Sequence, residues 1–205
     1  MSDKYLTRAG RDGISQEVSQ AATSAILFQH DVLKRAVKER LDLYVLRGSA
    51  GEGPLKAVWG QSTGTTFAEQ IRDVLRAGRN VSMLIWLTEP TLSPDLTALM
   101  REAENNVGWG RLDIRISGTE SGSDRLMHFL VAKSRDDERW IVRVESPHPT
   151  ISRIEDVESF EVPAALFFGG PEAERTGREL LSAFSKLFSA TSGREVDASN
   201  VKPQG

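Results

Sequence analysis

The stretch MHFLVAKSRDDERWIVRVESPHPT, residues 127–150, contains two apolar runs on either side of a charged segment. The runs LMHFLVA (126–132) and WIVRVES (140–146) have the length of strands, and SRDDER (134–139) has the composition of a turn. This pattern predicts a β-hairpin. One of only three histidines in the chain, His128, stands at its head. The hairpin is decisive because it adds antiparallel strands to a chain that otherwise alternates helices and strands.

The sequence before the hairpin carries clear helix and strand signals. Thr66 and Glu69 form a capping box, and Ser93 followed by Pro94 is typical of a helix start. Apolar runs of strand length between these segments indicate buried strands. In chain order the expected elements are helices over 14–28 and 30–40, a strand over 41–48, a helix over 66–77, a strand over 80–87, a helix over 94–105 and a strand over 111–117.

After the hairpin, EVPAALFFGG (161–170) predicts one more strand, and Pro171 begins a last helix. Together these elements predict an α/β fold in which a mixed β-sheet is sandwiched between helices. We expect one domain over residues 14–188, preceded by a mobile N-terminus over 1–13. The small and polar residues 189–205 predict a disordered tail.

Composition limits the classes of function. The chain has 205 residues, 26 basic against 29 acidic, so a nucleic-acid surface would have to be a local patch. It has no cysteine, which excludes disulfides and thiolate metal sites, and no metal-ligand spacing or cofactor motif occurs. No signal peptide is visible, and no run approaches the about 18 apolar residues of a membrane-spanning helix. These features predict a cytoplasmic protein without a cofactor, a metal or a membrane association.

The order of elements, with a histidine that opens a hairpin, resembles the core of the phospholipase D superfamily. The signature of that family is H-x-K-x4-D followed by G-S-x-N. The motif histidine would be His128, and G-S-x-N would fall on Glu145-Ser146-Pro147-His148. The resemblance covers most of residues 31–188 by the order of elements, but few motif positions by identity. It implies a phospholipase D-like fold.

Two departures from the signature concern the chemistry. In the family the histidine attacks phosphorus, the lysine neutralises the phosphoryl oxygens and the aspartate orients the imidazole. This chain has Leu130 at the lysine position and Arg135 at the aspartate position. The resemblance therefore implies a catalytically degenerate domain that acts as a binding, regulatory or assembly subunit, for nucleic acid or a protein partner.

Two alternatives stay open. The domain could be an active, metal-independent phosphodiesterase or nuclease in which Ser146 and His148 help His128. It could also be an unrelated α/β domain, in which His128 is hydrogen-bonded within a sheet and His148 lies in an exposed loop between prolines. For binding, Arg115 and Arg143 lie on alternating strands and could share a surface, and Trp109 between two glycines could be exposed to a partner.

The resemblance also bears on assembly. Family members pair two copies of the motif across an interface, and this chain contains one copy. We therefore expect a homodimer, or a heteromer with an intact partner, in which His128 faces the other chain.

Overall fold

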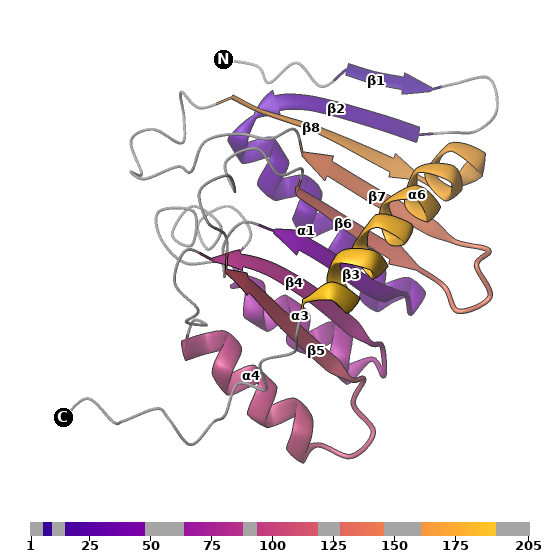
Figure 1. Cartoon of the computed structure of the whole chain (residues 1–205). Coiled ribbons are helices and arrows are strands. Elements are labelled where there is room, and N and C mark those ends of the chain that lie inside the picture. The colour runs from indigo at the N-terminus through magenta and orange to yellow at the C-terminus, as the bar shows by residue number, and fades with distance from the viewer. Residues whose placement is uncertain are drawn as a thin grey trace.

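The computed structural model describes residues 6–9, 15–47, 64–87, 94–118, 128–145 and 161–191. These residues form one eight-stranded sheet in the order β1-β2-β8-β7-β6-β3-β4-β5 (Figure 1). The strands are β1 (Leu6–Ala9), β2 (Ser15–Ala21), β3 (Asp42–Arg47), β4 (Val81–Leu87), β5 (Leu112–Gly118), β6 (His128–Lys133), β7 (Trp140–Glu145) and β8 (Glu161–Phe168). The helices are α1 (Ala22–Glu39), α3 (Phe67–Arg76), α4 (Pro94–Asn105) and α6 (Gly170–Ala190).

The sheet is mixed, as the sequence predicts. Strands β3, β4 and β5 are parallel, whereas β6 and β7 form the predicted antiparallel hairpin and β8, β2 and β1 continue antiparallel from it. Helices α1 and α3 lie on one face and α6 crosses the other (Figure 1). Leu96 and Leu99 place α4 in the same core as α1 and α3. The predicted α/β sandwich is confirmed.

The capping box at the start of α3 is present as expected. The Thr66 side chain accepts a hydrogen bond from the Glu69 backbone N–H at 3.2 Å, and Glu69 Oε2 accepts one from the Thr66 backbone at 2.6 Å. The helix buries Ile71, Val74 and Leu75 against the sheet. Such a cap fixes the residue at which α3 begins.

The N-terminal part differs from the prediction. The helix expected over 14–28 is wrong, because Ser15–Ala21 forms β2 and pairs with β8. A continuous α1 then replaces the two short helices expected. Strand pairing with a segment 140 or more positions away has overridden the local helical pattern here.

The ends of the chain are described only in part. Leu6–Ala9, within the segment expected to be mobile, pairs with β2 as strand β1. At the other end α6 continues to Ala190, and residues 192–205 lie outside the described residues. Within the described part of the chain, no helix has the length and apolar character needed to cross a membrane.

Several strand ends meet at one end of the sheet, which we call the carboxyl end. Parallel strands β3, β4 and β5 finish there. Because β6 is antiparallel to β3, it begins there with His128, and β7 finishes there with Glu145. In open α/β sheets, ligands commonly bind outside the carboxyl ends of the parallel strands.

Candidate functional site

The strand register brings three polar residues into one row at the carboxyl end. His128 of β6 lies directly opposite Glu145 of β7. On its other side, β6 pairs with β3 through Leu46 and Phe129, so the next step of the ladder sets Arg47 beside His128. Side chains alternate between the two faces of a strand. Val45, Leu130 and Ile141 belong to the core under α1 and α3, and each is an even number of positions from the polar residue of its own strand. All three polar residues therefore lie on the face covered by α1 and α3.

A fourth polar residue occupies the next row inward. Arg143 of β7 lies directly opposite Leu130 of β6, on the same face as His128. Arg143 is only 3% exposed. Directly opposite residues of an antiparallel pair have their Cβ atoms about 5 Å apart. A guanidinium therefore stands next to the position at which the phospholipase D motif has its lysine.

Glu145 contacts two of these side chains, His128 and Arg143. His128 Nδ1 lies 3.4 Å from Glu145 Oε2, and both side chains are largely buried. The other carboxylate oxygen, Oε1, accepts a hydrogen bond from Nη2 of Arg143. Glu145 thus contacts an imidazole with one oxygen and a guanidinium with the other. We call His128, Glu145, Arg47 and Arg143 the carboxyl-end cluster.

Arg47 is held differently from Arg143. Its guanidinium carbon lies 4.4 Å from the centre of the Phe67 ring, at the start of α3. Its Nη1 atom is buried and has no hydrogen-bond partner. A buried donor of this kind costs free energy unless a partner is supplied.

Burial works against the charges of both arginines. It lowers the pKa of Arg47 to about 10. Burial, followed by the positive charge of Arg47, lowers the pKa of Arg143 to about 9. Both groups stay cationic near neutral pH, so the cluster places two neighbouring positive charges in a poorly solvated environment.

The chemistry available at the cluster is that of anion binding. Guanidinium groups present planar N–H pairs that match the oxygens of phosphates and carboxylates. The imidazole and its carboxylate partner could also act on a proton. Within the described residues, no group of three or more His, Cys, Asp or Glu side chains could hold a metal ion.

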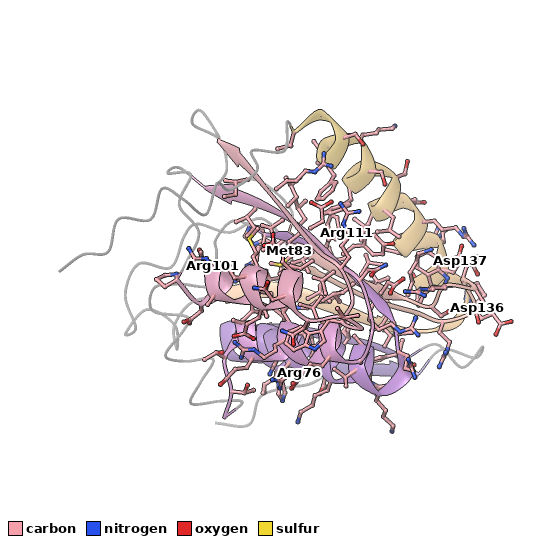
Figure 2. The ribbon with its side chains drawn as sticks, turned by 90° about the horizontal axis from the view of Figure 1, so that it is seen from below. Arg76, Met83, Arg101, Arg111, Asp136 and Asp137 are labelled. Atoms are coloured by element: carbon pink, nitrogen blue, oxygen red, sulfur yellow. The ribbon has the colours of Figure 1, made fainter. Side chains whose placement is uncertain are left out.

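The two departures from the family motif have clear positions. Leu130, at the lysine position, is 1% exposed and belongs to the main core. Arg135, at the aspartate position, lies in the hairpin turn at the opposite end of β6 and pairs with Asp42 at 3.3 Å. Asp136 and Asp137 lie in the same turn, at one extremity of the molecule (Figure 2). Neither departure is compensated from within β6 or the turn.

Lys133 does not replace the missing lysine. Alternation along β6 places it on the face opposite His128, where it pairs with Asp137 and lies 5.3 Å from the Trp140 ring. Trp140 itself is buried and donates from Nε1 to the Asp137 carbonyl at 2.7 Å. Lys133 and Asp137 therefore stabilise the hairpin turn.

Arg115 and Arg143 do not share a surface. Arg115 pairs with Leu84 in the β4–β5 register and therefore lies on the α6 face, whereas Arg143 lies on the α1 face. Arg115 Nη1 donates to the carbonyls of Phe188 and Thr191, and its guanidinium lies 4.0 Å from the Phe188 ring. It serves to hold the C-terminal end of α6, where unpaired carbonyls attract a cation.

Trp109 lies far from the cluster, at the opposite end of the sheet. It stands between α4 and β5, is partly buried, and packs against the main core. The guanidinium of Arg76 lies 5.3 Å from its ring (Figure 2 labels Arg76). The expectation of a freely exposed ring between glycines is not what the structure shows.

Of the expected site residues, the structure thus brings together His128 and Arg143. Ser146 and His148 lie outside the described residues. Sequence reasoning missed Arg47 and gave Glu145 no role. The signal for Arg47 was a charged residue directly after the run LYVL (43–46), because that is where a buried parallel strand reaches its carboxyl end.

One surface hollow lies away from this cluster. A polar groove of about 470 Å³ lies along α3 and α4, and it is lined by Gly64, Thr65, Glu69, Arg72, Asp73, Arg76 and Glu102. Its charges are paired with each other, for example Arg72 with Glu102 at 2.8 Å. We assign it no function.

Comparisons with known proteins support the fold. No protein-family model and no curated protein sequence matches the chain. Among solved structures, NucT from Helicobacter pylori matches with a TM-score of 0.54 and 9% identity, over 88% of this chain and 99% of that one. Polyphosphate kinase from Porphyromonas gingivalis matches with a TM-score of 0.53 and 8% identity, over 88% of this chain and 27% of that one.

A third match is TrmBL2, described as an archaeal chromatin protein with a novel mode of DNA binding, with a TM-score of 0.50 and 12% identity. The match covers 87% of this chain and 53% of that one, so the chain spans about half the length of TrmBL2. At these identities the matches show a shared fold. The expected phospholipase D-like α/β fold is therefore confirmed.

Proposed function

We propose that this chain is a phospholipase D-like domain that binds phosphodiester ligands, with nucleic acid as the first candidate, and that it does not catalyse efficient phosphoryl transfer. In this role it is a binding, regulatory or assembly subunit. The observation that carries the proposal is the buried Leu130 at the motif lysine position, while His128 is retained beside two guanidiniums. Cations remain for binding, but the ammonium that the motif places two residues after the histidine is absent, because Leu130 stands there.

The physical argument concerns the transition state. Charge that develops on the phosphoryl oxygens needs a donor aimed at them, and loss of one such stabiliser costs about 100- to 1000-fold in rate. Binding requires only that the ligand's charge is neutralised, which Arg47 and Arg143 supply. The match to a chromatin protein that binds DNA supports nucleic acid as the ligand class.

Binding is tested by fluorescence anisotropy with labelled single- and double-stranded DNA and RNA, at several salt concentrations. We expect Arg143→Met to weaken binding and to lower the salt dependence, because each lost phosphate contact lowers the slope by about one. Arg175→Met is the matched control, since Arg175 is an exposed arginine of α6. Absence of binding to every nucleic acid would reject this ligand class.

An active phosphodiesterase remains the second candidate, favoured by the 3.4 Å contact between His128 and Glu145. A carboxylate at Nδ1 can orient an imidazole for nucleophilic attack through Nε2. The test is hydrolysis of bis-p-nitrophenyl phosphate and of nucleic acids without metal, with wild type beside His128→Ala. Activity that is lost in His128→Ala would overturn the non-catalytic proposal.

A further inference from the structure

We infer that Arg47 and Arg143 bind one phosphate group together, and that this pair takes over the charge that the phospholipase D motif carries on the hairpin strand. The inference deepens the proposed function, on which it rests, by naming the group of the ligand that is recognised and the side chains that hold it. In place of a lysine at position 130 of β6, the chain has arginines on β3 and β7, the two strands that flank β6.

The positions of the two arginines carry the first step. Arg143 lies directly across from Leu130, in the row next to His128. Arg47 lies at the last position of β3, one ladder step beyond the Leu46–Phe129 pair, and so flanks His128 on the other side. Both project from the same face of the sheet. Two guanidiniums therefore flank the histidine from adjacent strands.

The contacts of Arg47 carry the second step. Phe67 covers its guanidinium at 4.4 Å, and the buried Nη1 atom has no hydrogen-bond partner. No ion pair joins Arg47 to a carboxylate within the described residues, whereas Arg143 is paired with Glu145. A buried cation with an unused donor is costly for folding alone. An anionic ligand would supply the missing acceptor.

The charge balance points to the class of ligand. The carboxyl-end cluster holds two guanidiniums and one carboxylate, so a single negative charge neutralises it when His128 is uncharged. A phosphodiester carries one negative charge and two non-bridging oxygens, which matches one oxygen for each guanidinium. A phosphate ester or inorganic phosphate shares this chemistry, so inorganic phosphate is a suitable probe.

The experiment measures thermal unfolding of the full chain against inorganic phosphate, with sodium chloride at equal ionic strength as reference. We expect phosphate to raise the Tm of wild type, because a ligand that binds only the folded state stabilises it. In Arg47→Met the phosphate effect should be lost, with affinity at least about 10-fold weaker. Without phosphate, its Tm should equal or exceed that of wild type, because an unpaired buried donor has been removed.

Two further variants sharpen the test. Arg47→Lys keeps the charge but not the planar fork, and should bind phosphate more weakly than wild type. Arg175→Met, at an exposed position, should respond like wild type. The inference is overturned if wild type gains no more from phosphate than from chloride, or if Arg47→Met keeps the full phosphate effect.

The outcome is separable from that of the proposed function. Phosphate stabilisation through Arg47 without nucleic-acid binding would support the phosphate site and reject the nucleic-acid ligand. Nucleic-acid binding that is unchanged in Arg47→Met would support the proposed function and reject this site.

Discussion

Gly177 illustrates how a single residue sets the distance between a helix and the sheet. It lies in the middle of α6, and a Cβ atom there would stand 2.4 Å from Trp140 Cε3 and 3.2 Å from Val142 Cγ2. Only the absence of a side chain lets α6 approach β7 this closely. The Trp140 ring is 3% exposed as a result.

We therefore expect Gly177→Ala to destabilise the fold, although alanine favours helix by about 1 kcal/mol over glycine. Overpacking a core costs about 1–3 kcal/mol, and most of this range exceeds the gain in helix propensity. Guanidinium denaturation measures the free energy of unfolding. Ser182→Ala, on the exposed side of the same helix, is the control and should be close to neutral. A Gly177→Ala variant more stable than wild type would refute the close approach.

Glu145 is the second residue whose replacement has a predictable result. Glu145→Gln removes the carboxylate that is paired with buried Arg143. The carboxyl-end cluster then has two guanidiniums and no carboxylate. We expect a loss of about 1–3 kcal/mol in the free energy of unfolding. Glu174→Gln breaks an exposed pair with Arg178 and should change little.

A double variant separates the charge effect from packing. The double variant Arg143→Met/Glu145→Gln removes both charges of the pair, so neither is left without its partner. Its loss in the free energy of unfolding should therefore be smaller than the sum of the losses of the two single variants. Strict additivity, measured by the same denaturation series, would mean that the two side chains do not interact in the folded protein.

At the scale of elements, helices α1 and α3 are joined by a buried polar pair. The Gln70 side chain of α3 hydrogen-bonds to His30 Nδ1 of α1, and both residues are buried. Because α1 begins at Ala22, His30 lies in the interior of this helix. It therefore links two helices rather than ending one.

This pair predicts a dependence of stability on pH. Burial is the main cause that lowers the pKa of His30 from 6.5, and the hydrogen bond to Gln70 opposes it only in part. Below pH 6.5 the unfolded chain then takes up a proton before the folded chain does, so stability falls as the pH falls. The free energy of unfolding of wild type, minus that of His30→Gln, should decrease from pH 7 to pH 5. A difference independent of pH would contradict this account.

At the scale of the whole molecule, the fold offers one carboxyl-end cluster per chain. The expectation of a dimer with His128 facing the partner therefore stays a prediction about assembly. Multi-angle light scattering at micromolar concentration should give twice the mass of the 22.6 kDa chain. A monomer would contradict it.

The position of that interface can be tested because the chain has no native cysteine. A single His128→Cys substitution should form a disulfide-linked dimer on oxidation if His128 faces its counterpart. Ser182→Cys, on the exposed side of α6, should not do so. Linking through Ser182→Cys instead would place the interface on the α6 face.

The sequence by itself determined the elements from β3 onward among the described residues, and their order. Local signals can be recognised in the sequence because each acts over a few residues. They include the capping box of Thr66 and Glu69, the proline that starts α4 and the two apolar runs of the hairpin. The same local reading failed at Ser15–Ala21, where pairing with the distant β8 makes a strand. It identified His128 and the missing lysine, because both are properties of single positions.

Only the tertiary structure decided which residues accompany His128. Arg47 and Glu145 lie 81 positions before it and 17 after it, and they become its neighbours through the register of β3, β6 and β7. The β6–β7 register buries Arg143 on one face of the sheet, and the β4–β5 register sets Arg115 on the other. Register depends on how strands far apart in the chain align, which no local period records, and a shift by one residue would turn every one of these side chains to the opposite face.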